Sequence, residues 1–168
     1  MWVNWSRTQR CEPAQYLRPA TRAQVADAVT RARTVRVAGS GHSFTGAVLT
    51  DGTLLSLERM ARVLDADPTS GLVRVEAGID LHRLSRELHF QGLALPNLGD
   101  IDAQSLAGAI ATGTHGTGAR LPNLSAQVEA VELVLADGSQ RTLSGGDALR
   151  AARIGLGALG VVVAVTLR

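Results

Sequence analysis

The hydrophobic positions along the chain show helical spacing in two segments. Apolar residues between positions 25 and 32 recur three and four residues apart, which predicts a helix with one buried face. Thr21 and Gln24 have the spacing of a capping box, so this helix is expected to begin just after Thr21. A second helix is predicted after Asp80, a residue type that caps helices, and Gly92 suits its C-terminal end. Its buried stripe consists of Leu81, Leu84 and Leu88.

Other segments carry the patterns of strands. Residues 73–77 alternate between apolar side chains and the charged Arg74 and Glu76, which indicates a half-buried strand. Asp137-Gly138 predicts a hairpin turn, after which residues 141–143 return as a strand. Further strands are predicted from segments rich in valine and leucine over residues 35–38, 54–57, 128–135 and 161–167.

The order of the elements indicates an α+β fold. Short helices are expected over residues 106–111 and 147–153, and strict alternation of strands and helices is missing. The first predicted strand leads into Gly39-Ser40-Gly41, but Phe44 stands where the third glycine of a G-x-G-x-x-G fingerprint belongs. The segment after it is not helical. These features argue against a Rossmann-type dinucleotide site.

Composition narrows the class of protein. The chain has 168 residues, 45% of them hydrophobic, which is enough for one domain with its own core. The net charge is only +2 and no basic cluster is present, so nucleic acid is not expected as a partner. All 17 basic residues are arginine, which excludes a lysine Schiff base and a P-loop lysine.

The sequence also bears on the compartment. Cys11 is the only cysteine, so no disulfide can form within the chain and a reducing compartment is expected. The first residues lack the apolar core of a signal peptide. The longest apolar run, residues 155–165, is shorter than the about 20 residues that span a bilayer. We therefore expect a cytoplasmic protein without a membrane span.

Two glycine-rich segments, each with one histidine, carry the candidate chemistry. In the first, residues 39–45, consecutive backbone N–H groups can form an anion-binding nest, and Ser40 and Ser43 add hydroxyl donors. His42 within this loop is a competent nucleophile near neutral pH, able to bond to the 8α carbon of a flavin. The alternative is a tight turn in which a backbone carbonyl satisfies His42.

The second segment, residues 105–118, consists almost entirely of small residues, which suits a surface approached by a flat ligand. The N-terminus of its short helix is expected to offer free N–H groups to an anion. His115 either lines a flavin ring or is structural. Asp100 and Asp102, in the preceding loop, either contact ribitol or ribose hydroxyls or are simply solvated. A metal site built on His42 and His115 lacks a third ligand, so no metal is expected.

An ordered set of motifs extends over essentially the whole chain. With this set, the sequence resembles the flavin domain of the sugar-1,4-lactone oxidase and alditol oxidase group, within the vanillyl-alcohol-oxidase-type (PCMH) FAD family. It is most similar to actinobacterial L-gulonolactone oxidases and dehydrogenases. The motifs are Asn4-Trp5, Pro19, Val37-Ala38-Gly39-Ser40-Gly41-His42-Ser43-Phe44, Thr50-Asp51-Gly52, Val75-Glu76-Ala77-Gly78, Gly92-Leu93-Ala94-Leu95-Pro96-Asn97, Ala111-Thr112-Gly113-Thr114-His115-Gly116-Thr117-Gly118 and Gly157-Ala158-Leu159-Gly160-Val161.

The resemblance implies an FAD-dependent oxidoreductase that removes hydride from a carbinol of an aldonolactone or polyol and passes the electrons to oxygen or another acceptor. It implies that the FAD pyrophosphate contacts residues 37–43 and that His42 is the covalent ligand. Gly99 falls at the position that influences oxygen access, and a glycine there favours an oxidase. His115 is the only candidate for a catalytic group. The implied FAD-binding residues are Val37, Ala38, Gly39, Ser40, Gly41, His42, Ser43, Asp100, Ser105, Gly108, Ala109, Ile110, Ala111, Thr112, His115 and Val162.

The resemblance also implies two small subdomains that clasp FAD, about residues 1–78 and 79–168. Relatives carry a substrate-binding cap domain after this part, which supplies the acid/base group and an arginine, whereas this sequence ends at Arg168 without one. We therefore expect an excised domain, a truncated gene product or half of a split enzyme that needs a separate cap domain. The alternative function is that of a non-catalytic flavin-binding fragment. The flavin face left exposed would favour self-association.

Overall fold

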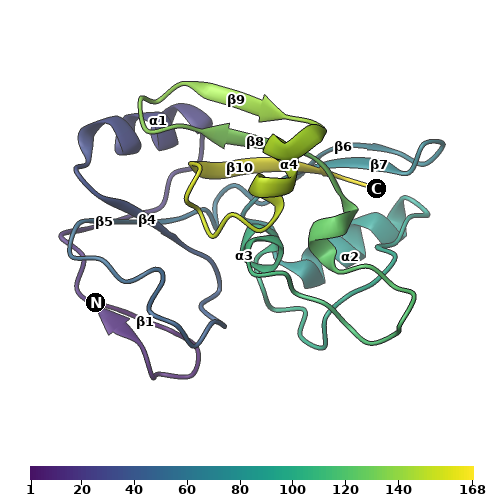
Figure 1. The fold of residues 1–168 in the computed structure, drawn as a ribbon, viewed down its shortest axis with the longest axis horizontal. Helices are drawn as coiled ribbons and strands as arrows, with labels where there is room; N and C mark the ends of the chain where they lie inside the picture. The colour runs from purple at the N-terminus through teal and green to yellow at the C-terminus, as the bar shows by residue number, and fades with distance from the viewer.

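A computed structural model describes residues 1–168. Its central element is a five-stranded antiparallel sheet that runs across the upper part of Figure 1. Every neighbouring pair in this sheet is antiparallel. In spatial order the strands are β6 (Val63–Asp67), β7 (Leu72–Glu76), β10 (Val161–Leu167), β8 (Val128–Val134) and β9 (Gln140–Leu143).

A smaller parallel sheet and a hairpin form the N-terminal side of the molecule, at the left of Figure 1. In the sheet, β5 (Thr53–Ser56) lies between β3 (Gln15–Leu17) and β4 (Val35–Ala38). The hairpin pairs β1 (Trp2–Val3) with β2 (Arg10–Cys11). The strands β1, β2 and β3 were not expected from the sequence, because two or three residues are too few to show a period.

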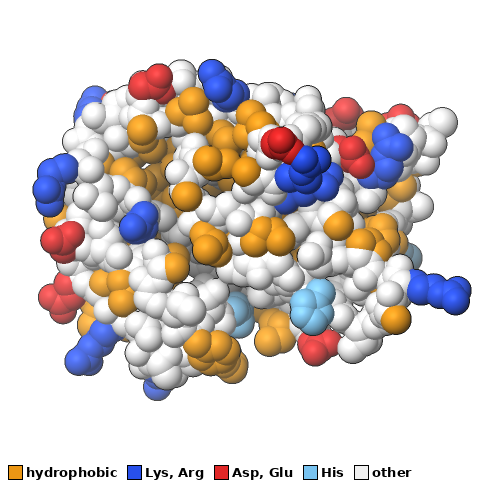
Figure 2. Space-filling view, in the orientation of Figure 1, with side chains coloured by type: hydrophobic (Ala, Val, Ile, Leu, Met, Phe, Trp, Pro, Cys, Tyr) orange, Lys and Arg blue, Asp and Glu red, His pale blue; other side chains and the backbone are white.

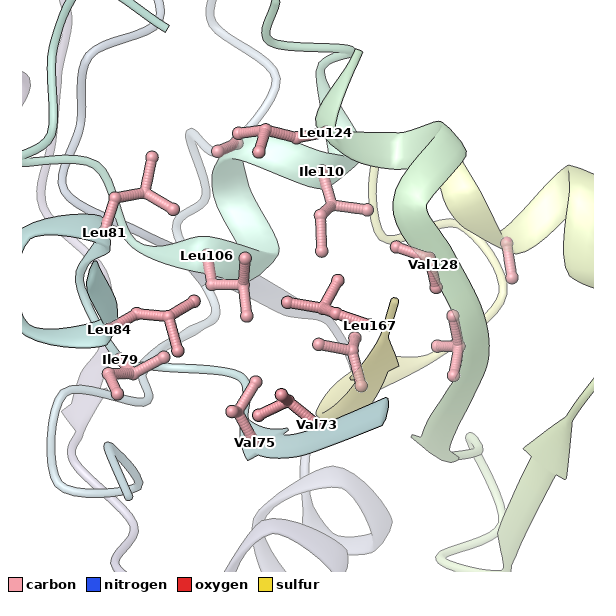
Figure 3. Packing of buried hydrophobic residues seen from close by; sticks show 14 of the residues in the cluster. Val73, Val75, Ile79, Leu81, Leu84, Leu106, Ile110, Leu124, Val128 and Leu167 are labelled. Atoms are coloured by element: carbon pink, nitrogen blue, oxygen red, sulfur yellow. The ribbon is translucent and has the colours of Figure 1, made fainter. Parts of the chain in front are cut away.

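Helices cover both faces of the five-stranded sheet. The helix α1 (Arg22–Arg31) packs with β5, β8 and β10 in one hydrophobic cluster. A larger cluster lies on the other face and is shown in Figure 3. The helical elements of that cluster are α2 (Leu81–Phe90), α3 (Leu106–Ala111), the 3₁₀ turn η1 (Leu124–Gln127) and α4 (Gly146–Arg153). Apolar packing on both faces explains why β10 is apolar at every position but Thr166, rather than alternating.

The predicted helix starts are confirmed by their capping bonds. The Thr21 hydroxyl accepts a hydrogen bond from the Gln24 amide at 3.2 Å. The Gln24 side chain reaches back to the amide of Ala20, one residue earlier than in a standard capping box, at 2.7 Å. The Asp80 carboxylate accepts from the Arg83 amide at 2.7 Å and begins α2. Local sequence therefore determines both helix starts.

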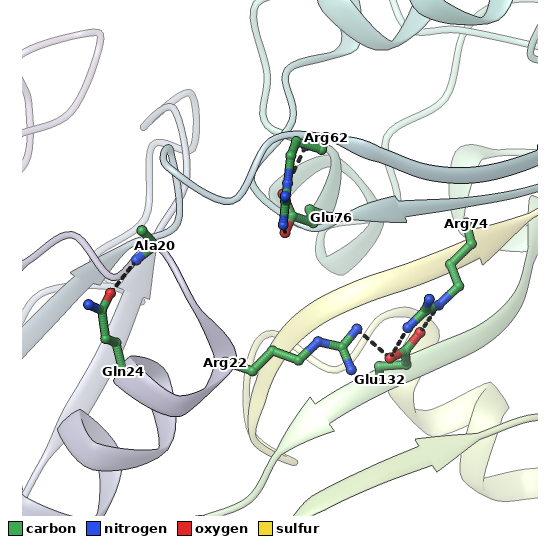
Figure 4. Close-up of polar contacts among 7 residues, drawn as sticks. All are labelled: Ala20, Arg22, Gln24, Arg62, Arg74, Glu76 and Glu132. Atoms are coloured by element: carbon green, nitrogen blue, oxygen red, sulfur yellow. Dashed lines mark hydrogen bonds and ion pairs between the residues drawn. The ribbon is translucent and has the colours of Figure 1, made fainter.

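The expectation of a half-buried strand over residues 73–77 is wrong for Glu76, whereas the Arg74 side chain is 42% exposed, as expected. Glu76 is buried and accepts hydrogen bonds from the Arg62 backbone and guanidinium, shown in Figure 4. Arg74 donates two hydrogen bonds to Glu132 on β8. Glu76 can be buried where the strand pattern alone indicated solvent because Arg62 pairs with its carboxylate.

The hairpin of β6 and β7 precedes residue 78, the boundary expected between the two subdomains. It nevertheless belongs to the five-stranded sheet, in which β7 pairs with β10.

No helix combines the length and the apolar character needed to cross a membrane.

Candidate functional site

A cleft of about 560 Å³ lies between the end of β4, the start of α3 and the loop that leads into β10. Hydrophobic side chains border the hollowed part of the face shown in Figure 2. The charged side chains that line the cleft are Arg33, Arg36 and Glu58. The cleft therefore combines apolar walls with an excess of positive charge, which suits an elongated anionic ligand with flat rings.

The loop after β4 presents unused donors to this cleft. The amide N–H groups of residues 40–43 donate to no acceptor in the chain. Gly41 adopts φ +73°, a conformation that is open to glycine at little cost. The hydroxyl groups of Ser40 and Ser43 also lack a partner within the chain. Consecutive free amides of this kind form the nest that the sequence predicts for a pyrophosphate.

The two glycine-rich segments approach each other at the floor of the cleft. A β-carbon added to Gly39 would lie 2.3 Å from the Ser105 hydroxyl oxygen and 3.7 Å from the Gly108 α-carbon. A β-carbon on Gly108 would lie 3.0 Å from the same hydroxyl oxygen. At both positions the atom that a β-carbon would meet is the Ser105 hydroxyl oxygen, so the two glycines leave room for this hydroxyl where the β4 loop and α3 meet.

The expectation of free amides at the start of α3 is wrong for its first two residues. The Leu106 amide donates to the Ile79 carbonyl at 2.8 Å, and the Ala107 amide donates to the Ala77 carbonyl at 3.1 Å. These bonds attach α3 to the segment after β7. The free amides of the cleft therefore belong mainly to the β4 loop.

His42 lies in that loop, where its ring stacks on an aromatic side chain and forms no hydrogen bond within the chain. Its Nδ1 atom is buried and has no hydrogen-bond partner. Its ring lies 5.6 Å from the Trp5 ring, with 24° between the planes. No backbone carbonyl satisfies the imidazole, in contrast to the structural role weighed from the sequence.

Most of the residues expected to bind a cofactor lie in this cleft. Gly99 instead packs against Thr114, where a β-carbon would lie 2.8 Å from the Thr114 methyl group. The expected cofactor-binding residues that line the cleft are Val37, Ala38, Gly39, Ser40, Gly41, His42, Ser43, Ser105, Gly108, Ala109, Ala111, Thr112 and Val162.

Three of the expected residues lie outside the lining of the cleft. Asp100 is exposed in its loop. The Ile110 side chain belongs to the larger hydrophobic cluster, 4% exposed. His115 is exposed, with its Nδ1 atom 2.9 Å from the Gly116 carbonyl oxygen. No group of three or more potential metal-ligating side chains is present.

Leu156 was missed by the sequence reasoning. It lines the cleft, is 65% exposed and has φ +49°, a left-handed conformation that non-glycine residues adopt at a cost. The only signal in the sequence was its place in a glycine-rich segment ahead of the last strand. Trp5, which stacks on His42, was noted as part of a motif but was given no role.

The residues of the cleft fit a dinucleotide such as FAD. The free amides of residues 40–43 match the two negative charges of a pyrophosphate, and the apolar walls match aromatic rings.

Curated proteins of known activity are similar to the whole chain. It is 46% identical over 172 residues to L-gulono-1,4-lactone dehydrogenase of Mycobacterium tuberculosis, covering 100% of this chain and 40% of that protein. It is 42% identical over 169 residues to alditol oxidase of a Streptomyces species, covering 98% and 41%. It is 40% identical over 172 residues to L-gulonolactone oxidase of Mus musculus, covering 98% and 39%. The chain thus spans about 40% of the length of these relatives.

Solved structures share the fold. A variant of Physcomitrella patens BBE-like 1 superimposes with a TM-score of 0.84 at 25% identity, covering 93% of this chain and 37% of that one. An alkyldihydroxyacetonephosphate synthase superimposes with a TM-score of 0.82 at 21% identity, covering 90% and 30%. The α+β fold and the similarity to lactone and alditol oxidoreductases expected from the sequence are confirmed. The sequence pattern described as FAD binding domain matches residues 13–144, and the chain belongs to this family.

Proposed function

We propose that this chain is the FAD-binding part of an oxidoreductase that removes hydride from a CH–OH group of an aldonolactone or alditol. The observation that carries the proposal is the run of unpaired amides at residues 40–43, on the edge of an apolar cleft. The similarity to L-gulono-1,4-lactone dehydrogenase and alditol oxidase supports the class of substrate. Because the chain covers about 40% of these relatives, we assign it the cofactor and not substrate turnover by itself.

Different residues of the cleft are proposed to contribute to FAD binding in different ways. The amides of residues 40–43 and the hydroxyls of Ser40 and Ser43 donate to the pyrophosphate, while Arg33 and Arg36 add positive charge. Gly39 and Gly108 let the two loops close beneath the cofactor. The remaining expected contacts, Asp100, Ile110 and His115, are proposed at the ends of the cofactor or through backbone atoms. When bound, FAD supplies the acceptor for a hydride, and it is reoxidised by oxygen or another acceptor.

We further propose that His42 holds the flavin covalently. When FAD is bound, a ring nitrogen of His42 would hold it through a bond to the flavin 8α carbon. For this bond the imidazole would give up its N–H proton, and the methyl group would give up a proton and an electron pair, with oxygen as the final electron acceptor. The unpaired Nδ1 of His42 supports this role, because no protein group competes for that nitrogen.

The proposal also covers the boundary between the subdomains, the access of oxygen and the cellular compartment. The first subdomain ends and the second begins at about residue 78, and the β6–β7 hairpin of the first subdomain pairs with the sheet of the second. Gly99 controls access of oxygen. The compartment is the cytoplasm, which suits a chain whose only cysteine, Cys11, is free.

The test measures flavin in purified protein. The protein is saturated with FAD, precipitated in acid and washed, and the absorbance and fluorescence of the redissolved pellet are recorded. Wild-type protein is expected to retain flavin, and His42→Ala is expected to release it while still binding FAD before precipitation. His89→Ala is the matched control, because this histidine is remote from the cleft on α2.

Two results contradict the proposal at different levels. If wild-type protein does not bind FAD in a fluorescence titration, the cofactor assignment fails. If flavin binds but acid releases all of it, or if His42→Ala retains it, the covalent assignment fails and the cofactor assignment stands.

A further inference from the structure

The N-terminal hairpin holds the His42 loop by its carbonyl groups. The Trp5 amide donates to the Gly41 carbonyl at 2.8 Å. The Asn4 side-chain amide donates to the Ser43 carbonyl at 3.0 Å, and the Gln9 side chain donates to the Phe44 carbonyl at 3.2 Å. The hairpin thus contacts three carbonyls in four consecutive residues of the loop.

This arrangement fixes the direction of one of the loop's free amides, that of His42. Every peptide bond in the chain is trans, so each N–H points opposite to the carbonyl of the same peptide unit. Because the Gly41 carbonyl faces the hairpin, the His42 N–H points away from it. The hairpin therefore orients the loop while it leaves the donors of residues 40–43 free.

Asn4 makes this connection rigid. It is 3% exposed, and its side chain also bonds to the Ser6 hydroxyl at 2.9 Å and accepts from the Gln9 amide at 3.0 Å. Gly41 is packed from the same side, since a β-carbon there would lie 3.3 Å from the Asn4 α-carbon. Asn4 therefore places Trp5 at a defined position beside the loop.

The orientation of the His42 ring depends on Trp5. Neither ring nitrogen of His42 forms a hydrogen bond within the chain, although histidine rings are normally oriented by such bonds. The near-parallel stack on Trp5, at 5.6 Å and 24°, is the aromatic contact that defines the plane of the imidazole. Trp5 itself is 64% exposed, so it contributes little to the core.

We propose that Trp5 is a positioning residue for attachment of the flavin, whose indole face holds the His42 imidazole in the plane required for a ring nitrogen to reach the 8α carbon. This inference rests on the proposed covalent role of His42. It predicts that losing the aromatic face slows attachment more than it weakens FAD binding, because the pyrophosphate donors of the loop stay in place.

The experiment compares Trp5→Leu, which removes the aromatic face, with Trp5→Phe, which keeps one. Flavin-free protein is mixed with FAD, samples are precipitated in acid over time, and the flavin bound to the pellet gives the attachment rate. Trp5→Leu is expected to slow attachment at least about tenfold, with Trp5→Phe within about threefold of wild type. The FAD dissociation constant before attachment is expected to change by less than about threefold. Phe90→Leu, at an exposed aromatic on α2, is the matched control.

A second measurement does not depend on flavin. In the NMR spectrum of flavin-free protein, the His42 ring protons are expected to carry an upfield ring-current shift that Trp5→Leu removes and Trp5→Phe partly restores. If Trp5→Leu does not fold, Trp5→Met replaces it in both measurements.

The outcomes separate this inference from the proposed function. If wild type and Trp5→Leu attach flavin at the same rate, the positioning role is overturned while the covalent role of His42 stands. If Trp5→Leu and Trp5→Phe are equally slow and both weaken FAD binding, Trp5 only supports the fold of the loop. If wild-type protein binds FAD but attaches none of it, the covalent role of His42 and the positioning role of Trp5 both fail, and the cofactor assignment stands.

Discussion

Replacing Glu132 by alanine removes the carboxylate that two arginines share between α1 and the five-stranded sheet. Arg74, on β7, donates to Glu132 at 2.5 and 2.9 Å, and Arg22, on α1, lies 2.5 Å from the same carboxylate (Figure 4). The Arg22 contact connects the helix that lines one side of the cleft to strand β8. The substitution therefore tests whether this ion cluster holds α1 against the five-stranded sheet.

The magnitude follows from how deeply each partner is buried. Removing one member of a fully buried ion pair costs about 3–5 kcal/mol, whereas an exposed pair contributes at most about 1 kcal/mol. The Glu132 side chain is 12% exposed, but those of Arg22 and Arg74 are 31% and 42% exposed, so both cations can regain water. We expect an intermediate loss of about 2–3 kcal/mol, which for a chain of this size lowers the midpoint of thermal unfolding by roughly 4–12 °C.

The same cluster predicts how stability depends on pH. The Arg74 guanidinium, and then Arg22, hold the pKa of the Glu132 carboxyl below its usual value despite burial. A lowered carboxyl pKa stabilises the fold above the unfolded-state pKa of about 4.3, and this contribution is lost as the pH falls through the folded-state pKa. Burial raises the pKa of Glu76, but its bonds to Arg62 outweigh this and lower it, so Glu76 acts with the same sign. Glu132→Gln is therefore expected to lose less stability on acidification than wild type.

The assay is thermal and urea unfolding followed by circular dichroism, at about pH 6 and about pH 3. The matched control is Glu87→Ala, because Glu87 is 43% exposed and lies 3.5 Å from Arg83. The control is expected to change the free energy of unfolding by less than about 0.5 kcal/mol. A Glu132→Ala midpoint within about 1 °C of the control, or equal acid sensitivity in Glu132→Gln and wild type, would refute the reasoning.

Three further predictions concern the cleft. Gly39→Ala is expected to weaken FAD binding at least about tenfold in a fluorescence titration, because its β-carbon would meet the Ser105 hydroxyl at 2.3 Å. Adding Ser105→Ala should restore binding, and normal binding by Gly39→Ala alone contradicts this reasoning. Gly41→Val is expected to lose FAD while its far-UV spectrum stays folded, since valine is strained at φ +73°, and unchanged flavin content argues against the phosphate loop. When the polypeptide of residues 1–168 is loaded with FAD, its flavin absorbance is expected not to bleach on addition of gulonolactone, arabinonolactone, xylitol or sorbitol without oxygen. Hydride transfer requires a substrate held over the flavin and a base for the substrate's hydroxyl proton. Rapid bleaching would show that residues 1–168 suffice for this reaction.

The sequence by itself determined the elements whose signals are local. Thr21 and Asp80 begin helices through bonds to residues three positions later, so the information lies within one turn. Segments rich in valine determined β8 and β10, and the nearly continuous apolar sequence of β10 suits a strand covered on both faces. The glycine-rich loops and their histidines were also recognisable, since glycine permits conformations that other residues avoid.

Only the tertiary structure decided which of these segments meet. The order of the strands, the burial of Glu76 and the Glu132 cluster depend on residues far apart in the sequence, such as Arg22 and Glu132, and no local period encodes such pairings. The amides of Leu106 and Ala107 are occupied because the segment after β7 passes beside α3. The stack of Trp5 on His42 likewise requires a hairpin whose two-residue strands carry no detectable pattern. Local propensity fixes the elements, whereas the geometry of the site depends on long-range packing that buries polar groups only where a distant partner satisfies them.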